Sequence, residues 1–209
     1  MTALVRSESA VPEFRLPPAF AGMRIGLLGG SFNPAHAGHL HISRIALARA
    51  GLDRIWWLVT PGNPLKDRSE LAELSDRIAG AKAVADDPRI VVTALEAVIG
   101  TRFTADTIGF LVRRYPDVRF VWIMGADNML GFHRWDRWRR IAGSVPMLVI
   151  DRPGAAFAGL RAPAAAVLQA QRLDESDAKL IADLEPPVWT LVHAPRSPLS
   201  STAIRQGAA

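Results

Sequence analysis

Two histidines three residues apart, His36 and His39, are the side chains of this chain best suited to chemistry. They stand where a glycine-containing turn leads into a stretch with helical spacing, and residues three apart share one face of a helix. Two imidazoles on that face would donate hydrogen bonds to triphosphate oxygens and stabilise the charge that develops when the α-phosphate is attacked. Two alternatives are ordinary polar residues at a helix start and a two-histidine metal site, for which the sequence offers no clear further ligand.

The turn before the histidines directly follows an apolar run at residues 24–28 and reads Gly29-Gly30-Ser31-Phe32-Asn33-Pro34. Its glycines permit a tight turn and the close approach of a ligand to the backbone, and the amides of the following helix would favour a phosphate. The pattern is neither a Walker A loop nor the GxGxxG fingerprint of dinucleotide-binding proteins.

Together, the turn and the His36-Ala37-Gly38-His39 segment closely resemble the signature of the nucleotidylyltransferase superfamily, GG(S/T)F(D/N)PxHxGH. The resemblance implies transfer of a nucleoside monophosphate from ATP to a phosphate-bearing acceptor, with both histidines catalytic. In this segment it assigns ATP contacts to Gly29, Gly30, Ser31, Phe32, His36 and His39. Asn33 stands where many members carry Asp, which keeps a turn-forming side chain and loses a charge.

A second phosphate-binding segment is expected near the end of the chain. Residues 198–205, Pro-Leu-Ser-Ser-Thr-Ala-Ile-Arg, resemble the superfamily's I-S-S-T-x-I-R motif. Hydroxyls and amides at a helix start form an anion site, and an arginine one turn further on reaches the same phosphates. The resemblance implies ATP contacts from Ser200, Ser201, Thr202 and Arg205, and a catalytic role for Arg205.

Residues 60–66, Thr-Pro-Gly-Asn-Pro-Leu-Lys, resemble the P-x-N-P-x-K loop of bacterial nicotinate-nucleotide adenylyltransferases. In that case Lys66 contacts phosphates and takes part in catalysis, since a flexible ammonium suits a phosphate. The alternative is a surface turn with a solvated lysine. Leu65 departs from the family, in which a Pro-His pair is common before the lysine, and this removes one phosphate contact.

Further segments match the same family and imply nicotinate mononucleotide as the acceptor. Residues 102–107 are similar to its (Y/F)-T-x-x-T segment, which places Thr104 on the pyridine carboxylate, at a position where it would also cap a helix. Residues 124–135 are similar to its G-x-D-x-(L/M)…W pattern, in which Asp127 accepts from a ribose hydroxyl and Trp135 stacks on the pyridine ring. Trp138 competes with Trp135, and one of the two is expected in the core.

From these segments and an R-P-G-like turn at residues 151–154, the resemblance implies two sets of contacts. Gly125 and Asp127 join the ATP set. The mononucleotide set consists of Ser31, Asn33, Lys66, Thr104, Asp127, Trp135 and Arg152.

The implied reaction joins ATP and nicotinate mononucleotide to give deamido-NAD and pyrophosphate, a step of NAD biosynthesis. Because the substrate phosphate is itself the nucleophile, positioning and charge stabilisation would suffice without a strong general base. Mg²⁺ is expected as a cofactor held mainly by the ATP phosphates. The alternatives are a related adenylyl- or cytidylyltransferase acting on nicotinamide mononucleotide, phosphopantetheine, FMN or glycerol phosphate, and a non-catalytic nucleotide or nucleic-acid binder.

Short apolar runs and helical patterns alternate along the chain. The runs that predict buried strands lie at residues 24–28, 55–59, 90–93, 120–124, 147–150 and 188–192. The helical patterns lie at residues 39–50, 71–85, 104–115, 136–142 and 174–184. This alternation predicts an α/β fold, a doubly wound, Rossmann-like and mostly parallel sheet with helices on both faces. Residues 1–22 are expected to form a flexible leader and residues 23–209 a single nucleotidylyltransferase domain.

Composition limits the class, the location and the partners that the protein can have. The 209 residues are 49% apolar and 22% charged and include no cysteine, which excludes disulfides and fits a cytoplasmic location. No apolar run approaches the ~20 residues that cross a membrane, and no signal peptide is expected. The net charge of +5 suits an anionic partner, but no basic run has the aromatic spacing of an RNA-binding sheet, so nucleic acid is not an expected partner. A homo-oligomer is left open.

Overall fold

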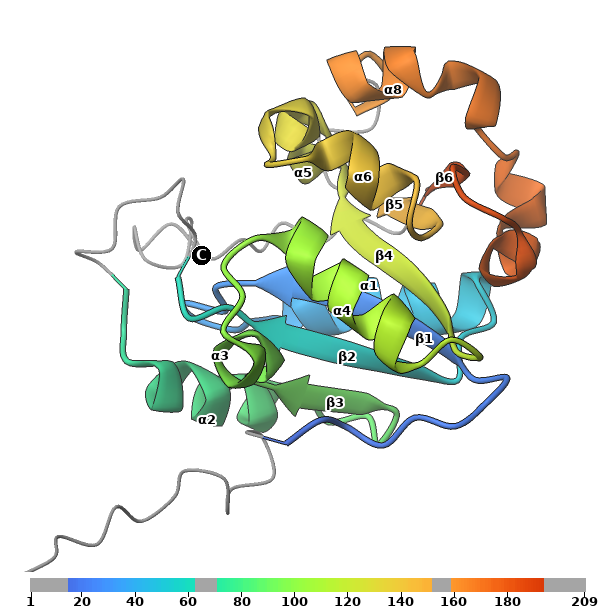
Figure 1. The fold of residues 1–209 in the computed structure, drawn as a ribbon. Helices are drawn as coiled ribbons and strands as arrows, with labels where there is room; N and C mark the ends of the chain where they lie inside the picture. Colours follow the sequence, from blue (N-terminus) through green and yellow to red (C-terminus); the bar gives the residue numbers. More distant parts are fainter. Residues whose placement is uncertain (1–14, 63–70, 152–158, 194–209) are drawn as a thin grey trace, which may run out of the picture.

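The computed structural model describes residues 15–62, 71–151 and 159–193. Within these ranges six strands form one sheet in the order β3-β2-β1-β4-β5-β6, and each neighbouring pair is parallel (Figure 1). The strands are β1 (Arg24–Gly30), β2 (Arg54–Val59), β3 (Ile90–Thr93), β4 (Arg119–Gly125), β5 (Met147–Ile150) and β6 (Trp189–Val192). All six predicted strands are confirmed, and the order is that of the Rossmann fold, which confirms the predicted fold class.

The strands are apolar on both sides because both faces of the sheet are covered. Successive side chains of a strand point to opposite faces. In β2, Trp56 and Trp57 are both fully buried, and each belongs to a different hydrophobic cluster. Strands buried on both faces form continuous apolar runs, which is why the sequence located them.

Each face has its own set of helices (Figure 1). The face of Trp57 is covered by α1 (Ala37–Arg49), α2 (Leu74–Val84) and the 3₁₀ helix η5 (Glu175–Asp183). The face of Trp56 is covered by α3 (Leu95–Ile99), α4 (Thr104–Arg114), α5 (Ala126–Gly131), α6 (Trp138–Ala142) and α8 (Pro163–Val167). Two single 3₁₀ turns, η3 (Phe132–Arg134) and η4 (Gln169–Gln171), follow α5 and α8.

The helix predicted at residues 136–142 is wrong at its start, and α5 is missing from the prediction. α6 begins only at Trp138, whereas α5 occupies the six residues directly after β4. Six residues are too few for a helical repeat to register, and Asp, Asn and Gly are weak helix formers. The pattern at residues 174–184 corresponds to η5, which is 3₁₀ rather than α-helical.

The described part of the predicted flexible leader, residues 15–22, lies against the domain. Leu16 and Ala19 pack on the cluster that contains Trp56, and the Tyr115 hydroxyl donates to the Pro17 carbonyl at 3.4 Å. This stretch of the leader is therefore part of the packed fold, because its apolar side chains find a site on the sheet face. No helix among the described residues is long and apolar enough to cross a membrane.

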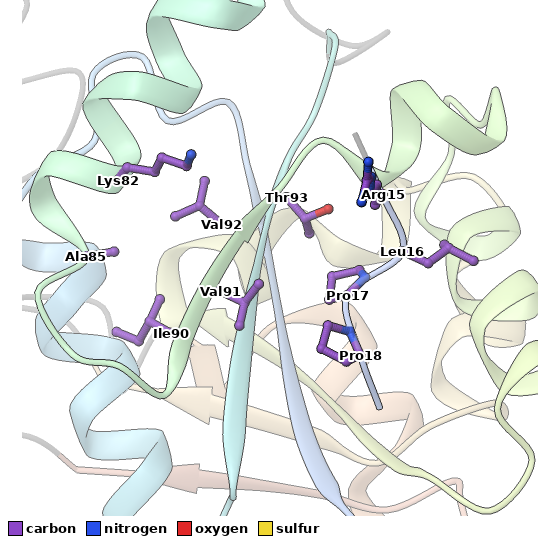
Figure 2. Close-up of a pocket in the computed structure, with 10 residues that line it drawn as sticks. All are labelled: Arg15, Leu16, Pro17, Pro18, Lys82, Ala85, Ile90, Val91, Val92 and Thr93. Atoms are coloured by element: carbon purple, nitrogen blue, oxygen red, sulfur yellow. The ribbon is translucent and has the colours of Figure 1, made fainter. Parts of the chain in front are cut away.

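A cavity of about 430 Å³ lies between this leader stretch, β3 and the end of α2 (Figure 2). Its walls come from Leu16, Pro17 and Pro18 on one side and from the side chains of β3 on the other, with Lys82 of α2 and the C-cap residue Ala85 nearby. None of the residues that the sequence assigns to a substrate lines it.

Candidate active site

The two central motifs follow neighbouring strands. β1 and β4 pair directly, and the helices that follow them, α1 and α5, cover opposite faces of the sheet. In sheets of this kind ligands bind beyond the carboxyl ends of the strands where the order reverses. The turn from Ser31 follows β1, and α5 with Asp127 in its first turn follows β4, so both segments lie at that point.

His36 and His39 cap α1 reciprocally. The His36 Nδ1 accepts a hydrogen bond from the Gly38 amide at 3.1 Å, and the His39 Nδ1 accepts from the His36 amide at 3.3 Å. This is a capping box in which imidazoles replace the usual hydroxyl and carboxylate. An Nδ1 that accepts carries no proton, so each neutral ring carries its proton on Nε2. The backbone thereby selects the tautomer in which Nε2 carries the proton and is a hydrogen-bond donor.

The two rings lie side by side at the start of α1. Their centroids are 4.0 Å apart, and His36 is buried while His39 is half-buried. Helix amides and the helix dipole favour negative charge at this end. Among the described residues, no group of three or more His, Cys, Asp or Glu is arranged to hold a metal ion.

Phe32 holds the turn by packing. Its φ of 47° lies in the left-handed region, which is unfavourable for a bulky residue. Its ring is 1% exposed, stacks on Trp57 at 5.0 Å and contacts His39 at 4.7 Å between centroids. An ATP contact at Phe32 would therefore come from its main chain rather than from the ring.

Ser43 and Trp57 fix the first turn of α1 to β2, a role that sequence reasoning missed. The Ser43 hydroxyl donates to the His39 carbonyl at 2.9 Å and accepts from the Trp57 Nε1–H at 2.8 Å. A serine four residues after the second histidine was the available signal, since serine hydroxyls often bond the carbonyl one turn earlier.

The missing side chain at Gly29 leaves space for a neighbouring side chain of the protein, and not only for a ligand. A Cβ at this position would lie 2.7 Å from Cη2 of the Trp122 indole, which crosses the end of β1. Trp122 in turn meets Trp135 edge-on, with ring centroids 6.1 Å apart. The turn after β1 and the tryptophan predicted to face the pyridine are thus connected through one buried indole.

Trp138 is the core tryptophan of the predicted pair. It is 8% exposed and packs in the cluster of Trp56, whereas Trp135 is half-buried and leans edge-on against Phe132. The expectation that one of the two belongs to the core is therefore confirmed. Trp135 is thus only partly covered, and Asp127 is exposed.

Thr104 does not cap α4, so that part of the prediction is wrong. The N-cap residue is Phe103, which has no side-chain cap bond, and Thr104 is the first helical residue. The hydroxyl that organises this segment belongs to Thr107, which donates to the Glu96 carboxylate at 3.1 Å and lies 2.9 Å from the Thr101 hydroxyl. Burial raises the pKa of Glu96, and hydrogen bonds from Thr60 and Thr107 oppose this effect.

An ion pair joins the first turn of α4, which begins at Thr104, to the N-cap of α6, two residues after Trp135. Arg137, the N-cap of α6, donates to both carboxylate oxygens of Asp106 in the first turn of α4, at 2.8 and 2.7 Å. Arg137 also holds a left-handed backbone conformation with φ of 50°. The pair lowers the pKa of Asp106 and ties the α4 start near Thr104 to the segment that follows Trp135.

Several predicted contacts lie outside the described residues, and their assignments stay predictions. They are Lys66, Arg152, Ser200, Ser201, Thr202 and Arg205. Asn33 is described, and its Oδ1 accepts from the Ala72 amide at 3.4 Å.

Comparison with known proteins agrees with this architecture. Residues 27–207 match the Cytidylyltransferase-like family. A protein of Methylorubrum extorquens (strain PA1) named "Probable nicotinate-nucleotide adenylyltransferase" is 58% identical over 183 residues, which cover 88% of this chain and 99% of the relative. The protein of the same name from Brucella suis biovar 1 (strain 1330) is 54% identical over 184 residues, with coverages of 88% and 95%.

Solved structures show the same fold at low identity. The nicotinic acid mononucleotide adenylyltransferase of Plasmodium falciparum complexed with NaAD has a TM-score of 0.67 and 17% identity, covering 88% of this chain and 83% of that one. The same protein complexed with APC gives a TM-score of 0.64. From the extent of the family match and the identity to these relatives, the chain belongs to the cytidylyltransferase-like family, in the branch that contains the nicotinate-nucleotide adenylyltransferases.

Proposed function

We propose that this protein is a nicotinate-nucleotide adenylyltransferase. An oxygen of the nicotinate mononucleotide phosphate attacks the α-phosphorus of ATP, the bond to the oxygen that bridges to the β-phosphorus breaks, and deamido-NAD and pyrophosphate leave. The name shared by relatives that match over 95% or more of their own length supports this reaction.

The observation that carries the proposal is the histidine capping box. Because both Nδ1 atoms accept from backbone amides, each ring would offer an Nε2–H donor at the start of α1, at the point of the sheet where ligands of this fold bind. Donors fixed before the reaction stabilise the charge that grows on the phosphates without reorganising during the step. The nucleophile needs no activation because a phosphate oxygen is already anionic.

The remaining contacts are assigned by the motif resemblance. In this scheme Gly29, Ser31 and Gly125 face ATP through their backbone, Thr104 and Trp135 face the pyridine, and Asp127 accepts from ribose hydroxyls. Lys66 and Arg205 supply further cations for the phosphates. Mg²⁺ enters with ATP and is held mainly by its phosphates.

A panel of acceptors tests the proposal. Purified protein is given ATP with nicotinate mononucleotide, nicotinamide mononucleotide, phosphopantetheine or FMN, and pyrophosphate release is followed. We expect the highest kcat/KM with nicotinate mononucleotide. Turnover of phosphopantetheine or FMN without turnover of nicotinate mononucleotide would contradict the assignment.

The same panel distinguishes the proposed enzyme from a non-catalytic nucleotide or nucleic-acid binder. A nucleic-acid binder would release no pyrophosphate with any acceptor, and its affinity for RNA or DNA would fall steeply as salt is raised. Comparing the two pyridine mononucleotides side by side measures the preference for nicotinate over nicotinamide.

A further inference from the structure

Arg77 is a buried cation beside the candidate site, and none of the motifs includes it. Its side chain is 3% exposed although it lies in the first turns of α2. Its Nε donates to the Ala72 carbonyl at 2.8 Å, and its Nη1 donates to the Ser31 carbonyl at 2.8 Å and to the Thr60 carbonyl at 2.7 Å. One guanidinium therefore joins three separate backbone segments.

Two of these carbonyls stand at the ends of neighbouring strands. The β1–β2 pairing ends at Gly30 and Val59, and the Thr60 amide still donates to the Gly30 carbonyl at 3.0 Å. Ser31 is the first residue after β1, and Thr60 is the first residue after β2. Arg77 Nη1 bridges the carbonyls of both, so it continues the connection between the strands one step beyond the last rung of the sheet.

The third contact brings in the segment that leads into α2. Ala72 receives the Arg77 Nε–H at its carbonyl and donates its own amide to Asn33 Oδ1. The turn after β1 is thus held at Ser31 by Arg77 and at Asn33 by Ala72. Phe32 lies between these two anchors, in its left-handed conformation and in contact with His39.

The cost of burying this charge favours a specific role. Burial lowers the pKa of Arg77, and the nearby Glu73 opposes that effect. An arginine nevertheless remains protonated in proteins. Burying a cation is unfavourable unless it is hydrogen-bonded, and here the main-chain carbonyls of Ala72, Ser31 and Thr60 accept from its Nε and Nη1. The planar guanidinium of arginine donates to several acceptors at fixed angles, which the ammonium group of lysine does not.

We propose that Arg77 is a positioning residue: by joining the Ser31 and Thr60 carbonyls it fixes the turn that sets His36 and His39 against the bound nucleotide. The proposal rests on the proposed function for its kinetic consequence. It does not require Arg77 to touch either substrate. Its effect passes through the main chain of the turn and the Phe32 ring to the histidines.

The test compares R77M, which removes the charge at similar volume, with R77K, which keeps the charge and loses the fork. Arg89→Met is the matched control, since Arg89 is an exposed arginine paired with Asp87 at the start of β3. We expect R77M to lower kcat by about 10- to 100-fold, because small displacements of positioned groups have effects of that size. R77K should recover part of this loss, and R89M should behave as the wild type.

A merely structural role makes different predictions. It would lower Tm while leaving kcat per folded molecule unchanged in both Arg77 variants, and that result would overturn the proposal. Should R77M fail to fold, R77K decides on the same criterion. Millimolar guanidinium added to R77A should raise its kcat, whereas sodium chloride at equal concentration should not.

A second readout is independent of turnover. The ¹⁵N resonances of the His36 and His39 rings report their tautomer and surroundings, and we expect them to shift in R77K but not in R89M. Unchanged ring resonances in R77K would refute the positioning role. Absence of wild-type turnover with nicotinate mononucleotide would instead refute the proposed function, and the resonances would still decide on Arg77.

Discussion

At the residue scale, the proposed reaction has His36 and His39 serve the helix with Nδ1 and the substrate with Nε2. Both Nδ1 atoms accept from backbone amides of the α1 start, which leaves the proton on Nε2. The motif spacing of three residues is therefore also the spacing of a capping box. This dual use lets structural and chemical effects be separated by substitution.

His39→Gln is expected to keep the cap and lose the chemistry. Glutamine is a standard residue at the third helical position of a capping box, so its side-chain oxygen can accept from the His36 amide. We expect Tm to change little, and kcat to fall by about 100- to 1,000-fold as the imidazole donor is lost. The control is His41→Gln on the same helix, with wild-type kcat. Wild-type kcat in folded His39→Gln would show that the ring is not catalytic.

Glu96→Gln is expected to change the pH dependence of stability. Burial raises the pKa of Glu96 in the folded protein, so the folded state favours the protonated carboxyl. Its favourable contribution is complete below the pKa of the unfolded chain and is lost as the pH rises through the folded pKa. Glutamine does not titrate, so the variant should be more stable than the wild type at about pH 8 and similar to it at about pH 4. Urea unfolding at both pH values measures this, and an equal difference at both would contradict it.

At the element scale, the ends of β1 and β4 are coupled through Trp122. The indole fills the space that Gly29 leaves and supports Trp135 edge-on. The glycine of the first motif and the tryptophan of a distant one are therefore parts of one packing unit. Sequence reasoning assigned Gly29 to ligand approach because a single sequence does not show which side chain crosses a strand end.

Gly29→Ala should disturb both stability and acceptor binding. The new methyl group would meet the Trp122 ring at 2.7 Å, and overpacking of a buried site costs roughly 1–3 kcal/mol. We expect a lower midpoint of urea unfolding and a larger rise in KM for nicotinate mononucleotide than for ATP. Gly80→Ala in α2 is the control: a Cβ there meets nothing within 4 Å, so alanine should stabilise the helix by about 0.5–1 kcal/mol. Wild-type stability in Gly29→Ala would contradict the packing role.

Element boundaries show where sequence reasoning stops. The six strands were predictable because a strand buried on both faces is a continuous apolar run. Such a run can be recognised in the sequence without knowledge of the contacts that the strand makes. The cap at Thr104 was wrong because the start of α4 depends on the contacts of its neighbours, and α5 is too short to leave a pattern. The burial of Arg77 and Glu96 was not predicted because a lone charged residue in a helical stretch is usually solvated. The available signal was the placement of Arg77 on the same helix face as the apolar Ile78, Ala81 and Leu74.

At the scale of the whole molecule, the sheet has the strand order in which the direction of the connections reverses between β1 and β4, which is where ligands bind in this kind of fold. The fold and the first motif's position in it were predictable from alternation of strands and helices. The packing of residues 15–22 was not, because a short proline-containing segment carries no repeat. Leu16 and Ala19 pack on the Trp56 face, and residues 15–18 line the cavity of Figure 2.

Removing residues 1–22 should therefore lower stability and leave the chemistry intact. Leu16 and Ala19 lose their contacts with the core, an effect of about 1–2 kcal/mol from the apolar surface they bury. A matched truncation of residues 1–14 retains those contacts, and the difference in Tm between the two truncations isolates their contribution. Equal Tm values would contradict the packing, and a large loss of kcat in the longer truncation would extend the role of this segment to the site.

The most direct test of the central claim follows the phosphorus atoms of ATP. Wild-type protein is incubated with nicotinate mononucleotide and ATP labelled at either the α- or the γ-phosphate. Attack at the α-phosphorus predicts that the α-label appears in deamido-NAD and the γ-label in pyrophosphate. Release of the γ-label as inorganic phosphate, or an α-label that never joins the pyridine nucleotide, would contradict adenylyl transfer at this site.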